Sequence, residues 1–577
     1  MYFYKKTTFA LLCLMTLLLA ACSPFGGGNT TQSIKLVKAP ANKQVYTVPQ
    51  VGTSDVTTLD PALVLASDTR SLSAIQMLYT GLVGLNDNLQ VQPQLAKSWD
   101  LASDGVTWTF HLKPGLKFSD GRPLTSADVV YSIDRALQPA TKSTIAPNYL
   151  GILKHADELL AGRINTLIGD SLQTPDANTV VLVAKKPAAY FLSILTYPCS
   201  YVVEKKLIDT YGADFTRHLT EGGSSGPFKI GQYIRGQEID FVPNTNYYEP
   251  KPQLQKVVFP FYAAPEKAYQ AYQAGQVDTT DIPVSTFATD KKHKDFHQVP
   301  QLWINYYTMN YLVKPFDSIH MRQAFALAID KTAIVNDVWK GTVLPTNHIV
   351  PQGMAGYNPD LKGPDDTQSL KGNPTQAKAL LQKGLQDEGW TSVSQIPPIK
   401  LTYATGPAMS TFDQEVTAMA KMWQDVLGVT VIPDPVDFNT LLDKVTAATN
   451  NHLGLQFWGF AWIAEYPDPQ DWLTMQFDRA VPNNSMNYGQ NLSVDAAQQQ
   501  AVQQQLEAAD TNMQQDARIK TYQQAEQQLV KDVAWMPMEQ VTTTFLRTPY
   551  IVGMMDNAQG MVPPDDWANI YKVMPES

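Results

Sequence analysis

Along most of the chain, apolar residues either alternate with polar ones or recur at helical spacing. Between Val106 and Leu112 every second residue is apolar, and a period of two predicts a half-buried strand. Pro114-Gly115 predicts a turn after it, Leu116–Ser119 a returning segment and Asp120-Gly121 a second turn. This stretch therefore predicts a small antiparallel layer.

Helical spacing follows at several places. Thr125 and Asp128, three residues apart, predict a capping box at the start of one helix. A second helix is expected after Asp317, where apolar residues recur at intervals of three and four. Asn373-Pro374 predicts the start of a third helix.

A fourth helix is expected to end at Gly428 and to precede a strand over Val429–Ile432. The glutamine-rich stretch 490–528 carries apolar residues at helical spacing, which predicts amphipathic helices with an uncharged polar face. Helices and strands are mixed throughout, so the predicted fold class is α/β with α+β mixing.

The first residues predict export. Lys5 and Lys6 precede a short apolar run from Phe9 to Ala21, which suits a signal peptide. The run ends in Leu19-Ala20-Ala21-Cys22, which resembles a bacterial lipobox. We expect a lipoprotein signal peptide over 1–21, then a lipidated Cys22 and a flexible tether over 22–44; an ordinary secretory signal is the alternative.

Composition narrows the class of protein. The 577 residues predict about three to four domains. A net charge of −10 argues against nucleic acid as a partner, because phosphate binding needs a basic face. No other apolar run is long enough to span a bilayer, so we expect membrane contact through the lipid anchor only. With Cys22 lipidated, Cys199 has no partner for a disulfide.

Two patterns suggest enzyme chemistry and are weak. Gly222-Gly223-Ser224-Ser225-Gly226 matches the nucleophile elbow of serine hydrolases, but that motif needs a strand before it and a helix after it. Here a helix is expected before Ser224 and a strand from Pro227. His293 and His297 have the spacing of a zinc pair but lie in a charged run with no third ligand nearby. We expect no enzyme activity, no metal and no cofactor.

An ordered series of segments resembles the extracytoplasmic solute-binding proteins of peptide ABC importers, the oligopeptide-, dipeptide- and nickel-binding family (solute-binding protein family 5). The resemblance covers nearly all of residues 45–575. The segments that carry it are Leu59-Asp60-Pro61, Leu78–Val83, Pro93–Trp99, Asp104–Leu112, Phe118–Thr125, Asp128–Ser132, Ser225–Phe228, Asn244–Tyr248, Ala274–Asp278, Asn310, Arg322–Ala324, Ala328–Asp330 and Trp462–Pro469.

The resemblance implies a two-lobed clamp like the periplasmic binding proteins, with an extra inserted domain. Carried onto this chain, it places the discontinuous domain I at 45–80, 223–308 and 539–575. Domain II would be inserted at 81–222. Domain III, the second lobe, would take 309–538.

It also implies a function, namely capture of oligopeptides or dipeptides between the lobes and delivery to the permease and ATPase subunits of an importer. The protein would be a monomer held by its lipid outside the cytoplasm, on the periplasmic or outer side of the cell membrane. Glu465 stands where the family has an Asp that pairs with the ligand ammonium, which leaves the effect of the longer side chain open. The other implied ligand-binding residues are Trp462, Ile463, Ala464, Asn310, Tyr307, Ser67 and Tyr149.

Other functions stay open at this point. Within the same family the ligand can be a nickel chelate, haem or a sugar. A chaperone or a receptor for signalling peptides would share the fold. A secreted hydrolase using Ser224 is the alternative of a different class.

Overall fold

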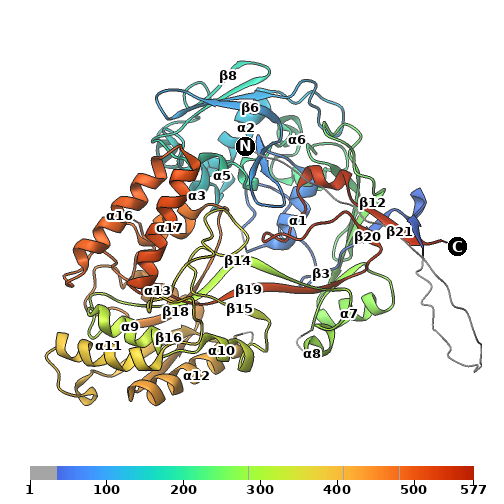
Figure 1. Cartoon of the computed structure of the whole chain (residues 1–577). Helices are drawn as coiled ribbons and strands as arrows, with labels where there is room; N and C mark the ends of the chain where they lie inside the picture. Colours follow the sequence, from blue (N-terminus) through green and yellow to red (C-terminus); the bar gives the residue numbers. More distant parts are fainter. Residues whose placement is uncertain (1–34, 66, 284, 407–408, 480, 577) are drawn as a thin grey trace, which may run out of the picture.

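The computed structural model describes residues 35–576 except 66, 284, 407–408 and 480. Helices and strands are mixed over these residues, as predicted. Two long strands, β14 (Phe296–Met309) and β19 (Met536–Arg547), cross the middle of the molecule and connect its two lobes (Figure 1). The predicted signal peptide and Cys22 lie outside the described residues.

One end of the molecule is a four-stranded antiparallel sheet in the order β6-β7-β9-β8. Its strands are β6 (Ala96–Leu101), β7 (Thr107–Leu112), β8 (Leu172–Asp176) and β9 (Thr179–Val183). Burial alternates along β7, which confirms the predicted strand. Residues 116–119 do not return along β7, because β6 and β9 already occupy both its edges. They form a tight loop closed by one bridge between Lys117 and Pro123.

Helix α2 (Ser126–Leu137) covers this sheet. It begins at Thr125, whose side chain forms the predicted capping box with Asp128. The box satisfies backbone N–H groups at the helix start that have no partner within the helix. Val129, Ile133 and Leu137 are buried on the face toward the sheet.

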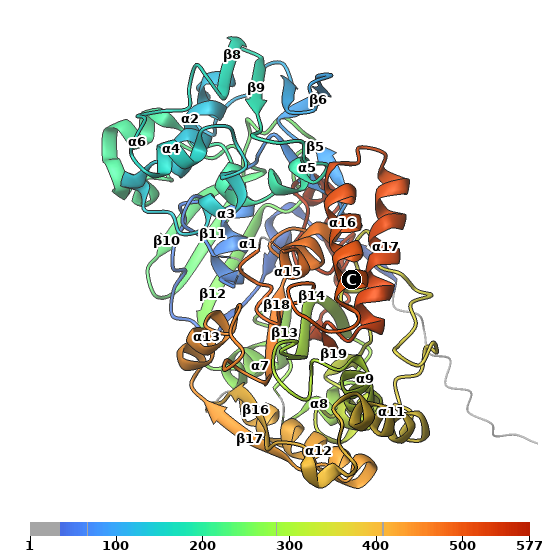
Figure 2. The same ribbon diagram turned by 90° about the vertical axis from the view of Figure 1, so that its left-hand side faces the viewer.

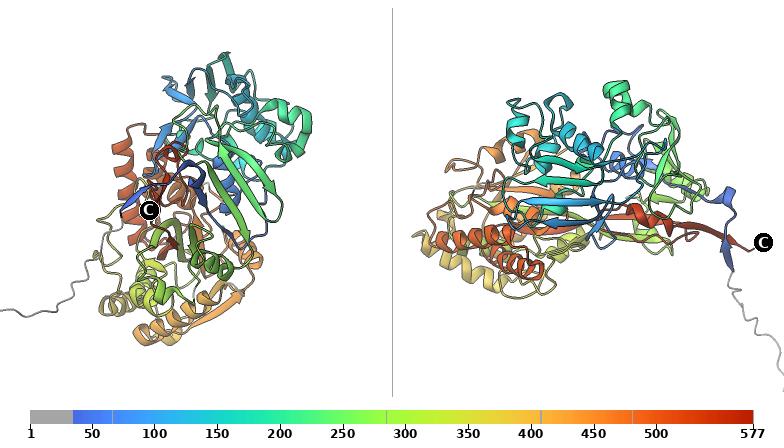
Figure 3. Two further views of the ribbon diagram at one scale, coloured as in Figure 1. Left: turned by 90° about the vertical axis from the view of Figure 1, so that its right-hand side faces the viewer. Right: turned by 90° about the horizontal axis from the view of Figure 1, so that it is seen from above.

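A second sheet combines an early segment with segments found about 200 residues later. Its strands are β10 (Phe228–Ile234), β11 (Glu238–Pro243), β12 (Lys256–Tyr262), β2 (Val45–Thr47) and β3 (Gln50–Val51). Strands β2 and β3 both run parallel to β12. This layer lies on the opposite side of the molecule from helices α16 and α17 (Figure 1 and Figure 3).

The predicted tether is too long at its C-terminal end. Residues 36–38 form β1 (Leu36–Lys38), which pairs with β21 (Tyr571–Pro575) in a three-stranded sheet completed by β20 (Ile551–Val552). A short 3-10 helix, η1 (Ala41–Lys43), follows. Residues 35–44 are thus part of the folded body, held there by a ladder with the C-terminal strand.

The largest sheet has seven strands and includes both long strands. Its order is β13-β19-β14-β18-β16-β17, with β15 paired to β19. The pairing of β14 with β19 shifts register between Pro300 and Ile304 and again between Asn305 and Tyr306. The remaining strands are β13 (Thr279–Asp281), β15 (Val343–Pro345), β16 (Ile399–Ala404), β17 (Val431–Val436) and β18 (Phe457–Ile463).

Helices cover the β16–β17 end of this sheet (Figure 2). They are α9 (Ile319–Leu327), α10 (Lys331–Asp337), α11 (Pro374–Asp387), α12 (Ser410–Leu427) and α13 (Phe438–Thr446). The predicted helices are confirmed, with Asn373 as the N-cap of α11 and Gly428 at φ 68° after α12. Helix α9 begins after Asp317 as expected, with Ser318 as its N-cap, and the strand predicted from Val429 begins at Val431.

The glutamine-rich stretch forms two helices, α16 (Ala496–Thr511) and α17 (Gln515–Lys531), as predicted. Leu506, Tyr522 and Leu529 are fully buried between them and β14. Several glutamines are buried as well, and Gln503 donates to the carbonyl oxygens of Phe477 and Tyr488 at 2.8 Å. The polar face is therefore partly a structural hydrogen-bonding surface.

Shorter elements complete the fold. They are α1 (Thr69–Leu78), β4 (Val83–Leu85), β5 (Val91–Pro93), α3 (Ala146–Leu150), α4 (Ala156–Leu160), α5 (Phe191–Ile194), α6 (Lys205–Tyr211), η4 (Gly212–Arg217), α7 (Pro265–Gln273), α8 (Phe287–Asp290), α14 (Pro469–Trp472) and α15 (Thr474–Phe477). Among the described residues, none of the helices combines the length and the apolar character needed to cross a membrane.

Separate apolar cores stabilise the two lobes. One core joins the four- and five-stranded sheets, a second lies under α9, α11 and α12, and a third fills the space between α16, α17 and the long strands. The seven-stranded sheet is continuous across residue 308, where the sequence places the boundary between domains I and III. The domain boundaries themselves stay a prediction.

Candidate functional site

The candidate site lies beside the middle of the long strands, where the two lobes face one another. A cavity of about 340 Å³ opens there, which we call the cleft cavity. Ser67, Gln76 and Tyr197 line it from one lobe. Trp303 of β14 and the segment after β18 line it from the other.

Strands β14 and β18 provide one wall of the cavity with the side chains on one face of the sheet. They are antiparallel, and Trp303 lies opposite Ile463, Asn305 opposite Ala461 and Tyr307 opposite Gly459. Because successive side chains on a strand point to opposite faces, these odd-numbered residues share one face. The residues that continue past Ile463 reach Glu465, which also lines the cleft cavity.

The loop that carries Glu465 is held rigidly. Asp468 caps α14 by accepting from the N–H of Gln470. The Asp468 carboxylate also pairs with both terminal nitrogens of Arg518, which is 1% exposed. Tyr466 stacks on Tyr190 of the other lobe, with ring centroids 6.1 Å apart and planes 6° apart. Pro467 and Pro469 restrict the residues before them to extended backbone, so the loop is preorganised.

Glu465 is held by hydrogen bonds with two residues, Tyr149 and Asp471. The Tyr149 hydroxyl lies 2.7 Å from both the carbonyl oxygen and Oε2 of Glu465, so it donates its proton across the lobe boundary. The Glu465 N–H donates to Oδ2 of Asp471 at 3.1 Å. Burial raises the pKa of Glu465, and the hydrogen bond from Tyr149 opposes that rise.

A second carboxyl lies directly behind Glu465. Asp471 is completely buried, and its Oδ2 accepts from the indole N–H of Trp462 at 3.1 Å as well as from Glu465. Its Oδ1 has no hydrogen-bond partner among the described residues. Burial, followed by the charge on Glu465, raises the pKa of Asp471 well above its usual range. No cation of the described chain pairs with either carboxyl, so nothing in the described chain offsets the negative charge that each carboxyl acquires on ionisation.

The predicted site residues do not all reach the cleft cavity. Ser67, Ile463, Ala464 and Glu465 line it. Trp462 and Tyr149 lie one layer behind, where they hold Asp471 and Glu465.

Tyr307 faces a neighbouring cavity rather than the cleft cavity. Asn310 is buried in the core, where its amide donates to Leu455 and its Oδ1 accepts from Leu312 and Asn487. The hydrogen-bonding groups of Asn310 are used inside the protein, so none is left for a ligand.

The alternative sites have other local structures. Ser224 is fully buried, with η4 before it and strand β10 starting at Phe228. The strand–serine–helix order of a nucleophile elbow is therefore missing at Ser224. His297 pairs with Asp556 at 2.7 Å, while His293 lies 3.7 Å from Asp295. Within the described ranges, no group of three or more His, Cys, Asp or Glu could hold a metal ion.

The sequence did not single out several residues that matter here. Gln76 and Tyr197 line the cavity from α1 and the segment after α5, and no local pattern marks them. The sequence could have indicated Trp303 as a site residue, because it lies four residues before Tyr307 on one strand and its side chain therefore points to the same face. Asp471 could have been suspected from its place three residues after Asp468 in the loop.

Comparisons with known proteins bear on this site. The family model described as bacterial extracellular solute-binding proteins, family 5 Middle, matches residues 90–484. The oligopeptide-binding protein OppA of Bacillus subtilis (strain 168) is 26% identical over 486 residues, covering 83% of this chain and 85% of that protein. The dipeptide-binding protein DppE of the same organism is 25% identical over 512 residues, covering 88% and 89%. The probable deoxycholate-binding periplasmic protein YgiS of Escherichia coli (strain K12) is 26% identical over 517 residues, covering 88% and 91%.

Solved structures show the same fold. The unliganded open form of the periplasmic murein tripeptide-binding protein MppA gives a TM-score of 0.78 at 25% identity, covering 93% of this chain and 99% of that one. Another structure, of Escherichia coli MppA, gives 0.65 at the same identity, covering 92% and 99%. Each of these two structures shares the fold of this chain over nearly its whole length.

Proposed function

The chain belongs to the bacterial extracellular solute-binding proteins of family 5, and from this premise we propose that it captures peptides in the cleft cavity for an ABC importer. One observation carries the choice of peptides. Glu465 presents a carboxyl to the cavity without an ion-pair partner among the described residues. A ligand with a cationic end supplies the missing charge, and every peptide with a free N-terminus has one.

The contact energies favour a shared binding mode. A charge-assisted hydrogen bond of this kind contributes about 1.5–3 kcal/mol. Micromolar affinity requires about 8 kcal/mol. The ammonium pair is therefore a minority contribution, and backbone pairing along the cavity wall and apolar contacts supply the rest. Such a division suits a carrier that accepts many sequences.

Lobe closure is the second part of the proposal. The open arrangement leaves the cavity accessible, and a ligand that touches both walls stabilises the closed arrangement by its additional contacts there. The closed form would then dock on the membrane permease, which cytoplasmic ATPases drive. Ser67 and Tyr197 from one lobe and Glu465 from the other are the contacts expected to strengthen.

Membrane attachment through Cys22 is part of the same proposal. The segment Leu19-Ala20-Ala21-Cys22 supports it, and a diacylated cysteine provides the two chains that stable anchoring requires. Radiolabelled palmitate should enter the wild type and not Cys22→Ser. Equal labelling of both proteins would remove Cys22 from the anchor.

The decisive experiment measures peptide binding by thermal shift after the protein has been unfolded, freed of ligand and refolded. A ligand at 100 times its Kd adds about 2.7 kcal/mol of stability. Glu465→Gln should weaken binding of free-amine peptides about 10- to 100-fold and should leave N-acetylated peptides unaffected. Equal losses for both kinds of peptide would remove Glu465 from the ammonium role.

The alternative ligands give a different result in the same assay. If no peptide raises the melting temperature while haem, a nickel chelate, a sugar or deoxycholate does, the peptide proposal fails. Deoxycholate is an anion, and the uncompensated charge at Glu465 and Asp471 disfavours it.

A further inference from the structure

Next to the cleft cavity lies a second one, of about 250 Å³, which we call the aromatic cavity. Nearly all of its wall is apolar. The residues that define it are Tyr307, Tyr403, Phe412, Phe438, Ala461 and Ile463. The inference that follows rests on the proposed function, because it concerns the same ligand.

Small residues on β18 keep this cavity open. Gly459 and Ala461 lie opposite Tyr307 and Asn305 on the shared face of the two strands. A Cβ at position 459 would come within 2.7 Å of the Tyr307 ring, so glycine lets that ring lie flat over the strand. Trp458 and Trp462 have the opposite parity and pack in or against the core, while Phe460 also lines the aromatic cavity.

The two cavities adjoin. Trp303 and Ile463 line both of them. A strand rises about 3.3 Å per residue, so Ile463 lies about 7 Å and Ala461 about 13 Å along the strand from Glu465. An extended peptide has the same rise. With its ammonium at Glu465, such a peptide would bring side chains two to four positions along the chain to the aromatic cavity.

The chemistry of the wall selects what can enter. No Lys, Arg, His, Asp or Glu is among the described residues that line the aromatic cavity. The Asn305 side chain is already used, since it donates to Glu539 at 3.0 Å and accepts from Trp303 at 3.0 Å. A charged side chain would lose its hydration there without gaining a partner. An apolar one would exchange water for aromatic carbon.

We propose that the aromatic cavity is a subsite for one large apolar side chain of a peptide whose ammonium pairs with Glu465, and that it discriminates against charged side chains at that position. The ligand class is therefore narrower than peptides in general. It comprises peptides with a free N-terminus and a Phe, Leu or similar residue shortly after it.

Pentapeptides of alanine with one changed residue test this by calorimetry on the purified protein. Phe, Leu, Lys or Glu is placed in turn at positions two, three and four. At one of these positions Phe should bind at least about tenfold tighter than Ala, and Lys and Glu should bind more weakly than Ala. Affinities that agree within threefold for all residues at every position would overturn the subsite while leaving the peptide function intact. If no pentapeptide binds, both proposals fail.

Filling the cavity gives the matched comparison. Ala461→Phe should abolish the preference for Phe over Ala in the ligand and keep the sensitivity to N-acetylation. Ala447→Phe adds the same side chain at an exposed position outside the cavity and should change neither. A preference that survives Ala461→Phe in a folded protein contradicts the proposal.

A substitution at the exposed edge of the aromatic cavity tests the proposal if Ala461→Phe does not fold. Phe438 is 49% exposed and stacks on Phe460 with centroids 6.1 Å apart, so its truncation leaves the core untouched. Phe438→Ala should lower the preference for a Phe-containing peptide over the all-alanine one by about threefold or more. An unchanged preference in Phe438→Ala would count against the subsite.

Discussion

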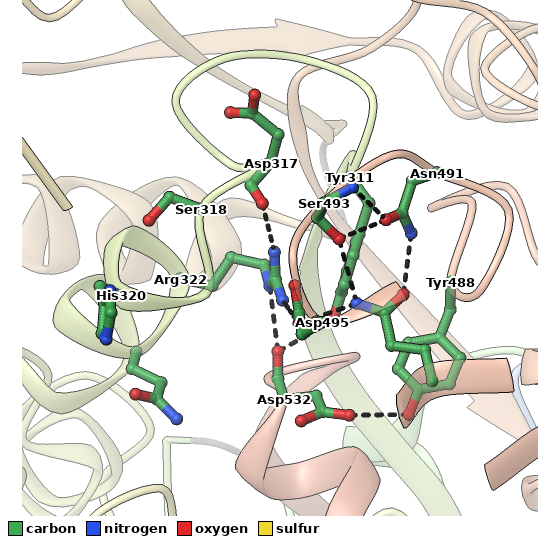
Figure 4. A network of polar contacts seen from close by, with 12 residues as sticks. Tyr311, Asp317, Ser318, His320, Arg322, Tyr488, Asn491, Ser493, Asp495 and Asp532 are labelled. Carbon is green, nitrogen blue, oxygen red and sulfur yellow. Dashed lines mark hydrogen bonds and ion pairs between the residues drawn. The ribbon is translucent and has the colours of Figure 1, made fainter. Parts of the chain in front are cut away.

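The second lobe has two buried clusters of ionisable residues. The Arg322 network, around Arg322 and Asp495, contains a cation, whereas the Glu465 corner, formed by Glu465 and Asp471, does not. Arg322 is completely buried, and each of its three guanidinium nitrogens donates to an acceptor. It donates to the carbonyl oxygens of Asp532 at 3.0 Å and Phe316 at 2.8 Å and to Asp495 Oδ2 at 2.7 Å. Figure 4 shows the guanidinium group between Asp317, Asp495 and Asp532 and beside Tyr311.

The Glu465 corner has carboxyls but no cation. Glu465 and Asp471 share a hydrogen bond through the Glu465 backbone, and burial raises the pKa of both. In the Arg322 network, burial works against the charged form of Asp495, but the charge of Arg322 together with hydrogen bonds from Gln499 and Ser493 outweighs burial, and the pKa of that carboxyl falls. The ionised form of an aspartate is thus favoured in the Arg322 network, at Asp495, and disfavoured in the Glu465 corner, at Asp471.

The presence or absence of a cation indicates a structural role for the Arg322 network and a ligand-binding role for the Glu465 corner. A buried ion pair with a full set of hydrogen bonds has no remaining capacity for a ligand, and removing one partner leaves an unpaired charge. Carboxyls without a cation destabilise the empty protein and gain from a cationic ligand. Opposite responses to neutralisation should therefore distinguish the two clusters.

The largest effect is expected from Arg322→Met. This change leaves the Asp495 carboxylate and two carbonyl oxygens buried without their donor, so it should lower the free energy of unfolding by about 3–5 kcal/mol in urea titrations. Arg479→Met is the control, because Arg479 and Glu507 are about half exposed and such pairs contribute about 0–1 kcal/mol. A loss below about 1 kcal/mol at Arg322 would remove the contrast between the clusters.

The opposite sign is expected from Asp471→Asn. A carboxyl whose pKa is raised on folding contributes stability at low pH that is lost as the pH rises through the folded value. Asparagine does not titrate, so the variant should be about 1–2 kcal/mol more stable than the wild type at pH 8, with a smaller gain at pH 5. Thermal melting at both pH values measures this.

Asp468→Asn is the matched control for that change, on the same loop. Asp468 pairs with Arg518, so its neutralisation should destabilise the protein. Destabilisation by both substitutions would show that Asp471 is a structural anion like Asp468.

The smallest effect is expected from Tyr149→Phe, which removes one hydrogen bond to Glu465 and should cost about 0.5–1.5 kcal/mol of stability. That bond lowers the pKa of Glu465. Its loss raises this pKa further, so binding of a free-amine peptide should begin at a higher pH than in the wild type. Tyr197→Phe, whose hydroxyl donates to Val64 instead, should leave the pH at which binding begins unchanged, whatever its effect on affinity; an identical shift in both variants would contradict the assignment.

Local patterns predicted much of the fold. The β7 alternation, the Thr125 capping box, Asn373 as a cap and Gly428 as a helix end were all readable, because each depends on neighbours within a few residues. The Arg322 network was not readable. Its partners Asp495 and Asp532 lie 173 and 210 residues further along the chain, and no spacing rule connects them.

The candidate site divides in the same way. The loop after Trp462 could be located from its resemblance to a family segment, and strand parity groups Trp303 with Tyr307. Parity does not say which face of a strand meets a cavity. Asn310 matched the family segment, yet Asn487 and Leu455, which saturate it, become neighbours only in the folded chain.

The register shifts in β14 have a consequence for how far the lobes can move. The first interrupts the pairing of β14 with β19 between Pro300 and Ile304, where the pairing of β14 with β18 begins at Trp303, and the second follows between Asn305 and Tyr306. Such irregularities bend a ribbon locally, so they offer a pivot, and displacement grows with distance from a pivot. A rotation of the lobes that moves residues near Glu465 by a small distance moves α6 and α12, at the outer ends of the lobes, by a larger one (Figure 2). The distance between spectroscopic labels on those two helices should therefore change more on closure than the distance between labels at Ser67 and Ala464. A protein that contacts the outer ends of both lobes could then distinguish the ligand-bound form from the empty form.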